Sequence, residues 1–595
     1  MCRPLPRVEM RTKSLRVLSV AVAAIALPAL AHQVVQNQSQ PAAAPASSAP
    51  ADATATATQP APDLQASPAD ESATEQLNTF NVSSTPTLAL EYPGWARRNP
   101  WVVGSLDPES HGFGTEPWGS ASGIFLSELL RRMDTPIASR WAHIALRDAL
   151  LAKAKAPSQV NPVDWVAERA WLLLRLGEAD AARMLVSGVD TDRFTPKMVQ
   201  VGVQSALANA DASALCPLES GIAKYDANIR ALVEAMCSAL AGEKEIASAM
   251  IDDARRHGRV GGVDLALAEK VVGAAGSGRA TTIEWDPVDT LTAWRFGLAA
   301  ATGMAPPDRL VSSSPTQLRA FEARAPLLSP KQRLDSALVA AGIGVFSSQS
   351  LIDLYSAIYD STDPSDLPGT DAWQVRQAFV GKDQDTRLGA IRKLLGNQSD
   401  PVRKEAMRAL VARAATLVKP DPKLAKDAPD LISAMLAAGY DQAAAQWIPA
   451  IGRMDDANSD RCWAMVALAG PGIADVGANR LNAFIGRDQS RNKMRSALLV
   501  AGLAGLGRIS TATANSLNRR YGFGLGRQSS WTSMIDGSAA RGQAGTVLVL
   551  TGTGFQTADI SQIPAVHMYH AVAALKRTGQ EFTARMIAAE ALSRT

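Results

Sequence analysis

The sequence is poor in aromatic residues, which make up 5% of its 595 residues, and it contains only four cysteines. A low aromatic content without sustained alternation of apolar and polar residues argues against a protein built mainly from β-strands. The Cys and His residues lack the spacing of a zinc site, so we expect no metal. Beyond residue 31, no apolar run approaches the roughly 20 residues of a membrane span, and we expect no transmembrane segment there.

The sequence also lacks an excess of charge of one sign. Its formal net charge is +3, but residues 1–31 hold five Lys or Arg and one Glu, which leaves −1 for the rest. A nearly neutral protein has no global field that attracts polyanions. We therefore expect no nucleic-acid partner.

Catalytic and cofactor motifs are scarce as well. No G-x-S-x-G or Ser-x-x-Lys motif occurs in a strand-turn-helix setting. The run TVLVLTGTGF (546–555) is the one strand-like stretch, but its Gly552 and Gly554 lack the third glycine and the downstream acid of a dinucleotide site. We interpret the run as a buried helix or an extended connector, and we expect no cofactor.

The N-terminus has the pattern of a secretory signal peptide. The basic segment 11–16 precedes the apolar VLSVAVAAIALPALA, which ends with the small residues Ala29 and Ala31. This pattern predicts cleavage after Ala31 and a periplasmic protein. An uncleaved membrane anchor is the alternative, and translation can begin at Met1 or Met10.

Residues 32–84 are rich in Pro, Ala, Ser and Thr and contain few large apolar side chains. Such a segment buries too little area to offset the entropy of ordering it, so we expect a disordered linker. We divide the rest into an N-terminal helical-repeat region, 85–305, and a C-terminal one, 306–595.

Helix signals recur throughout these two regions. Asn161-Pro162, Asp286-Pro287 and Asp400-Pro401 each place a capping residue before a proline at the first helical position. Gly177 and Gly303 are positioned to end the first two of these helices. The sequence therefore predicts many helices with short connections.

The stretch WLLLRLGEADAARMLV (171–186) predicts two helices joined at Gly177, with Ala182 on the second. The same order, an apolar helix end, a glycine and an alanine five residues later, occurs at Gly242/Ala247, Gly439/Ala444, Gly507/Ala512 and Gly579/Ala584. It resembles the turn of tetratricopeptide repeats, in which a small residue lets two helices cross closely. Residues 387–410 resemble instead a HEAT-type hairpin. These resemblances imply an all-α fold, an α-solenoid of helical hairpins, and no particular activity.

Three cysteines follow the signal peptide. Cys216 and Cys237 are 21 residues apart, and we predict a disulfide between them if the two helices fold together in an oxidising compartment. The alternative is that both are small buried side chains, which is the role that we expect for Cys462.

Two groups of residues are candidates for binding a partner. The stretch NRRYGFGLGRQSSW (518–531) combines cationic and aromatic side chains with glycines, a composition suited to an anionic polymer or a partner protein. Three tryptophans precede the first expected helices in Gly- and Pro-rich loops. The candidate residues are Arg519, Arg520, Tyr521, Phe523, Arg527, Trp95, Trp101 and Trp118. For both groups, the structural alternatives are a simple connector and a cap on the helices.

We expect a non-catalytic periplasmic scaffold or adaptor that binds a protein partner in envelope assembly or export. The alternative is a glycan-acting envelope hydrolase, since soluble lytic transglycosylases join a solenoid to a lysozyme-like domain. Glu109-Ser110-His111-Gly112-Phe113 resembles their Glu-Ser-x-Phe motif but has one extra residue and lies in a loop. A third possibility is a purely structural envelope component. His567 and His570 share a helix face without a third metal ligand nearby, so we assign them to packing or to the surface.

Overall fold

The computed structural model of the chain describes residues 93–133, 136–224, 226–258, 260–277, 281–396, 398–471 and 476–595. The predicted signal peptide and nearly all of the predicted linker lie outside these residues. Arg98–Thr595 belong to one compact unit, and residues 93–97 belong to another, Leu30–Arg97. The division into two repeat regions at residue 305 stays a prediction.

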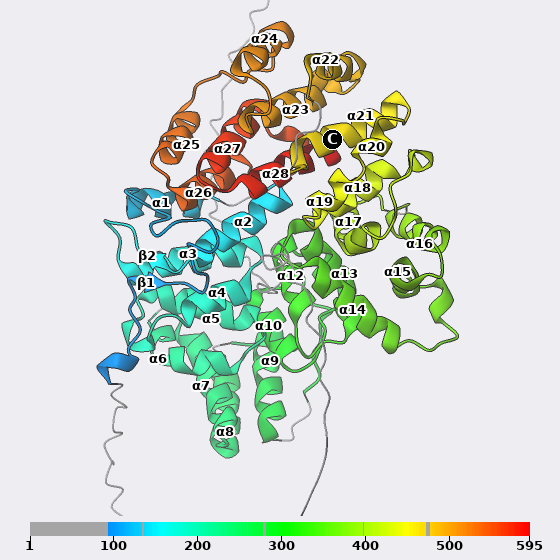
Figure 1. The fold of residues 1–595 in the computed structure, drawn as a ribbon. Helices are drawn as coiled ribbons and strands as arrows, with labels where there is room; N and C mark the ends of the chain where they lie inside the picture. The colour runs from blue at the N-terminus through cyan, green and yellow to red at the C-terminus, as the bar shows by residue number, and fades with distance from the viewer. Residues whose placement is uncertain are drawn as a thin grey trace, which may run out of the picture. The chain divides into compact units, whose positions relative to one another are not determined.

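The regular secondary structure of the described residues is almost entirely α-helical, which confirms the all-α class (Figure 1). One short antiparallel pair of strands, β1 (Val102–Val103) and β2 (Ala154–Lys155), is present. Consecutive helices pack on one another along most of the chain, an arrangement compatible with a helical-repeat solenoid.

The helices are short and follow one another closely. The first ten are α1 (Gly123–Arg132), α2 (Arg140–Leu151), α3 (Pro162–Leu176), α4 (Ala179–Val186), α5 (Pro196–Ala208), α6 (Glu219–Ile222), α7 (Ala227–Leu240), α8 (Lys244–Arg256), α9 (Gly262–Val272) and α10 (Ala293–Ala301). The next are α11 (Asp308–Ser312), α12 (Thr316–Arg324), α13 (Pro330–Ile343), α14 (Ser348–Asp360), α15 (Asp371–Val380), α16 (Gln384–Gly396), α17 (Pro401–Ala415), α18 (Ala428–Ala437) and α19 (Asp441–Ala445). The last are α20 (Ile448–Ile451), α21 (Asp456–Ala469), α22 (Ala478–Arg487), α23 (Met494–Gly505), α24 (Thr511–Tyr521), α25 (Ser530–Ala540), α26 (Ala544–Gly554), α27 (Ala565–Arg577) and α28 (Glu581–Ser593).

Two of the three predicted helix starts are confirmed. The side chains of Asn161 and Asp400 accept hydrogen bonds from the first backbone N–H groups of α3 and α17. The start predicted at Asp286 is wrong, because α10 begins at Ala293. There the hydroxyl of Thr292 accepts a hydrogen bond from the Arg295 N–H at 3.2 Å, and this cap sets the helix start.

The five glycine joints share one geometry. Each glycine has a positive φ and joins two consecutive helices that contact each other: Gly177 (99°), Gly242 (93°), Gly439 (81°), Gly507 (65°) and Gly579 (85°). At every joint the glycine N–H and the next N–H donate to the carbonyls three and five residues earlier, respectively, the Schellman pattern. The alanine five residues after the glycine is buried at four joints, and Ala512 is the exposed exception.

The same hydrogen-bond pattern occurs at three further glycines, Gly303, Gly344 and Gly542. Of these, only Gly303 was expected to end a helix. Gly344 and Gly542 are followed five residues later by Gln349 and Val547, so they lack the alanine that marks the other joints. Helical hairpins therefore extend over more of the chain than the glycine-alanine pairs indicate.

Two further segments with local predictions, 546–555 and 387–410, are largely helical. The run 546–555 lies almost wholly in α26 (Ala544–Gly554), which is buried, so the interpretation as a buried helix is confirmed. The HEAT-like segment forms α16 and α17, which pack on each other.

The early helices pack against the last ones. Helix α2 contacts α26 and α28, and α1 contacts α26, which places the blue-cyan helices beside the orange-red ones (Figure 1). The carboxylate of Glu590 on α28 accepts hydrogen bonds from the Ser139 hydroxyl (2.6 Å) and the backbone N–H groups of Arg140 (2.9 Å) and Trp141 (3.2 Å). Glu590 thus caps the N-terminus of α2 from the other end of the chain.

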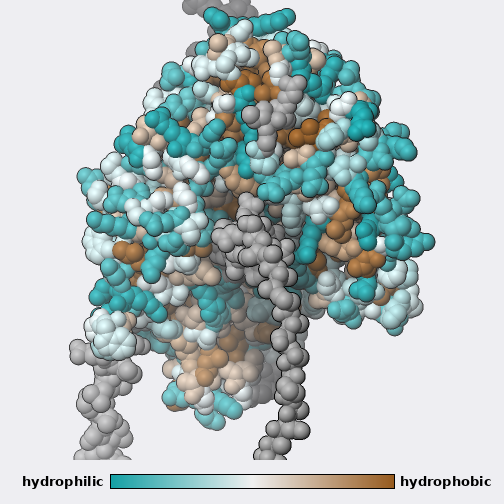
Figure 2. Space-filling model, in the orientation of Figure 1, coloured by the Kyte–Doolittle hydropathy of each residue, from teal (hydrophilic) through white to brown (hydrophobic). Residues whose placement is uncertain are grey.

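The surface in the view of Figure 2 is mostly hydrophilic, with apolar side chains in separate patches. One patch lies over α7 and α8, where Leu240 and Ile246 are about half exposed. Within the part of the chain that the structure describes, no helix combines the length and apolarity needed to cross a membrane.

Candidate functional site

The connection between α24 and α25 forms a surface that we call the cationic-aromatic turn, consisting of Arg519, Arg520, Tyr521, Phe523 and Arg527. Helix α24 ends at Tyr521 and is capped by Gly522, whose φ of 70° lies in the left-handed region. The rings of Tyr521 and Phe523 stack with centroids 5.6 Å apart. The Arg520 guanidinium carbon lies 5.3 Å from the Tyr521 ring centroid, a cation–π contact.

The three arginines of this turn are exposed. Among the described residues, no carboxylate lies within 4.0 Å of their side-chain nitrogens. The turn itself is anchored, because Leu525 is buried and its N–H donates to Asn518 Oδ1 at 3.0 Å. An ordered backbone therefore presents three unpaired positive charges beside two stacked rings.

The three candidate tryptophans differ in exposure. Trp95 is 88% exposed and Trp101 is 47% exposed, so both are available for contact with a partner. Trp118 is 1% exposed and packs edge-on against Trp165, with ring centroids 5.2 Å apart. Its assignment to a binding surface is wrong, because its indole is enclosed by the core.

Glu109 lies in an exposed turn before α1, and its backbone carbonyl accepts a hydrogen bond from Gly112 N–H. The loop packs on the joint between α27 and α28, where Gln580 Nε2 donates to the carbonyls of His111 and Gly112, each at 2.9 Å. Glu109 lines neither of the two cavities described below. The loop thus covers a late helical joint.

The two histidines of α27 make separate contacts. His567 Nδ1 lies 3.1 Å from the Gly554 carbonyl, and His570 Nδ1 lies 2.9 Å from an Asp536 carboxylate oxygen. Among the described residues, no three potential metal ligands lie together.

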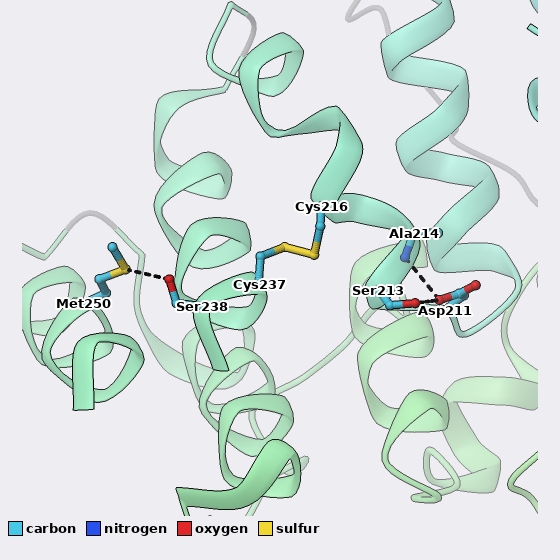
Figure 3. The surroundings of a disulfide bond; sticks show 7 residues. All are labelled: Asp211, Ser213, Ala214, Cys216, Cys237, Ser238 and Met250. Atoms are coloured by element: carbon cyan, nitrogen blue, oxygen red, sulfur yellow. Dashed lines mark hydrogen bonds between the residues drawn. A yellow bond between two sulfur atoms is a disulfide. The ribbon is translucent and has the colours of Figure 1, made fainter. Parts of the chain in front are cut away.

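Cys216 and Cys237 form a disulfide, with their Cα atoms 5.6 Å apart (Figure 3). It links the short 3-10 helix Ser213–Leu218 to α7. The start of this 3-10 helix is held by the Asp211 side chain, which accepts hydrogen bonds from Ser213 and Ala214 (Figure 3). Cys462 is fully buried, and burial raises the pKa of its thiol to about 12. Its thiol is therefore a packing group.

Two carboxyl groups away from these surfaces have raised pKa values, the buried Glu322 and the partly buried Asp180. Burial raises the pKa of Glu322 to about 7, although the hydroxyl of Ser336 donates to it at 2.6 Å. Burial likewise raises the pKa of Asp180 to about 7, against the opposing effect of Arg324. A raised carboxyl pKa in a packed interior affects stability, and neither group faces a described cavity.

The sequence did not reveal a cavity of about 610 Å³ between α17, α18, α21, α23 and α28. The charged side chains that line it are Lys404, Glu405, Arg408, Arg461, Arg495, Asp559 and Arg594. A smaller cavity of about 280 Å³ adjoins it and shares Gln398, Lys404 and Arg408. No local motif marks these residues, because each lies within an ordinary helix or connector and only packing brings them together.

Comparison with known proteins yields no relative. No protein-family model, no curated protein and no solved structure matches this chain. We therefore infer function from the residues described above.

Proposed function

We propose that the protein is a non-catalytic scaffold of the cell envelope that binds an acidic segment of a partner protein. The cationic-aromatic turn is the contact surface. The predicted signal peptide and the helical-hairpin architecture support this proposal, since helical-repeat proteins present extended surfaces for partners. Exposed Trp101 and Trp95 are further candidate contacts.

The observation that carries the proposal is the set of three exposed, unpaired arginines on an anchored turn. Exposed arginines are usually free to sample many conformations, and binding them costs side-chain entropy. Here the stacking of Arg520 on Tyr521 and of Tyr521 on Phe523 reduces that cost. Arg and Tyr are also the residue types that contribute most to protein interfaces.

Charge complementarity selects the partner's chemistry. A segment with several Asp or Glu residues supplies bidentate acceptors for guanidinium groups. Such a complex should weaken as salt concentration rises, because exposed ion pairs are screened.

The test begins with site-specific photocrosslinking from position 523 in cells, followed by binding measurements with the purified captured protein. We expect the crosslink to lie in an acidic segment. The triple variant R519E/R520E/R527E should reduce affinity by about 100-fold or more, since each charged contact contributes a kcal/mol or more. The control K331E/K419E/K423E makes the same charge change at exposed lysines elsewhere and should bind as the wild type does.

Equal binding by the two triple variants would contradict the proposal. Crosslinking to an anionic glycan instead of a protein would also overturn it. E109Q provides a further test, because a glycan-cleaving activity that disappears in E109Q would favour the hydrolase over the scaffold.

A further inference from the structure

The cavity between α17, α18, α21, α23 and α28 is large enough for a small molecule. Its volume of about 610 Å³ lies within the range of roughly 300–1,000 Å³ that is usual for ligand sites. Its described lining is polar and aliphatic, and none of these residues is aromatic. Stacking of a nucleobase or a sugar ring therefore has no support here.

Two of its cations are already engaged by the protein. Arg408 is buried, pairs with Glu405 and donates to the Ser593 carbonyl at 3.2 Å. Arg594 donates to the Ala138 carbonyl at 2.7 Å and to Glu590 at 2.8 Å. These two side chains form fixed parts of the wall.

The other three cations, Lys404, Arg461 and Arg495, have no such partner. Among the described residues, no carboxylate lies within 4.0 Å of their side-chain nitrogens, and these nitrogens donate no hydrogen bond. They come from α17, α21 and α23 and line one cavity. An oxyanion placed there meets three unpaired positive charges.

The acidic groups at the cavity do not cancel these charges. Glu405 is paired with Arg408, and Asp559 accepts a hydrogen bond from the Ser561 N–H at 2.7 Å. The charged side chains of the described lining comprise five cations and two anions. The net charge of the described lining is therefore positive.

Two features of Arg495 are compatible with an anion at this site. The Nε atom of Arg495 is buried and has no hydrogen-bond acceptor among the described residues. Burial, and repulsion by the nearby Arg461 guanidinium, lower the pKa of Arg495. A bound oxyanion supplies acceptors and relieves this repulsion.

We propose that this cavity binds a small, non-aromatic molecule that carries two or more carboxylate or phosphate groups, held by Lys404, Arg461 and Arg495. Two or more anionic groups match three separate cations better than one does. The site does not depend on the cationic-aromatic turn, and its ligand is distinct from the proposed protein partner.

The test is calorimetric titration of the full chain with citrate and, separately, with pyrophosphate. The chain carries its tag at the N-terminus because Thr595 lines the cavity. We expect saturable binding of at least one probe with one site per chain. Tighter binding of citrate identifies a polycarboxylate ligand, and tighter binding of pyrophosphate identifies a phosphate-bearing one.

R461Q and R495Q should each weaken binding about tenfold or more, because each loses charge-assisted hydrogen bonds. The control R519Q/R520Q removes two exposed arginines of the turn and should leave binding unchanged. Without ligand, R461Q should unfold at the wild-type temperature or above it, since the substitution relieves repulsion of Arg495. This second measurement separates loss of binding from loss of fold.

Absence of saturable binding by both probes would overturn the proposal. So would equal affinities of R461Q, R495Q and the wild type. Failure of these tests leaves the scaffold proposal intact, because R519E/R520E/R527E tests a different surface.

Discussion

Glu590 accepts the hydroxyl hydrogen bond of Ser139 at 2.6 Å, although 451 residues separate the two along the chain. The same carboxylate accepts the Arg140 and Trp141 N–H groups and pairs with Arg594. It therefore connects α2 to α28 through charged and capping interactions in a buried place.

Replacing this carboxylate by an amide should destabilise the protein. In E590Q the side chain turns an N–H₂ group towards donors that need an acceptor and leaves Arg594 without its partner. We expect the free energy of unfolding to fall by about 3 kcal/mol, the usual cost of breaking a buried charged pair. Chemical denaturation measures the loss, and hydrogen exchange should show it at α2 and α28. S139A removes the bond to Glu590 and the capping bond from the Ala142 N–H, and it should cost about 1–2 kcal/mol. An E590Q protein as stable as the wild type would contradict the prediction.

Two glycine-to-alanine substitutions should have opposite effects. Gly439 has a φ of 81°, and a Cβ there would lie 3.2 Å from Trp141 Cη2 and 3.1 Å from Phe582 Cζ. G439A should lose more than about 1 kcal/mol of stability. Gly389 lies inside α16 with open space around it, so G389A should gain about 0.5–1 kcal/mol. Thermal unfolding distinguishes the two variants. Equal changes in their unfolding temperatures would show that the joint at Gly439 tolerates a side chain.

The disulfide should stabilise the region around α7 in particular. Its loop spans 21 residues, for which chain-entropy arguments give about 3 kcal/mol. We expect the unreduced protein to weigh two hydrogen atoms less than the reduced one. Reduction should accelerate hydrogen exchange in α7 and the neighbouring 3-10 helix. C462S is the control, and two free thiols at Cys216 and Cys237 would disprove the bond.

The stability of the protein should depend on pH through Glu322. Its pKa of about 7 in the folded state exceeds the ordinary value of 4.5, so the folded protein binds more protons than the unfolded chain between these two pH values. The contribution of the protonated carboxyl is fully present below pH 4.5 and is lost as the pH rises towards 7. The loss amounts to about 3 kcal/mol.

E322Q imitates the protonated carboxyl and should remove this dependence. At pH 8 it should unfold at a higher denaturant concentration than the wild type, whereas at pH 5 the two should differ little. The exposed substitution E109Q serves as the control. If the free energy of unfolding depended on pH in the same way for E322Q and the wild type, Glu322 would not be the cause of the dependence.

Local signals in the sequence predicted the local structure well. Asn161-Pro162 and the glycine joints act within a few residues, and their capping bonds require only the backbone nearby. Gly344 and Gly542 were missed because their joints lack the following alanine. The helix expected to start at Asp286 starts instead after Thr292. Asp and Thr both cap helices, and the sequence alone does not show which of the two residues caps this one.

The surfaces were predictable only in part. Exposure of the turn at Arg519 follows from its charge and glycine content, but the burial of Trp118 depends on Trp165 and the packing of distant helices. The cavity at Arg461 and Arg495 had no sequence signal at all. Its walls come from helices up to almost 200 residues apart, and only tertiary contacts decide which charges face each other.

The cap that Glu590 places on α2 also has a kinetic consequence. In an open repeat array, folding can nucleate at one hairpin and spread to its neighbours while the chain is still being made. Here the hydrogen bonds from the N-terminus of α2 to Glu590 form only after a helix some 450 residues later has been synthesised. A long-range contact of this kind slows folding. We therefore expect this early segment to stay incomplete during synthesis, which is compatible with the proposed export across a membrane.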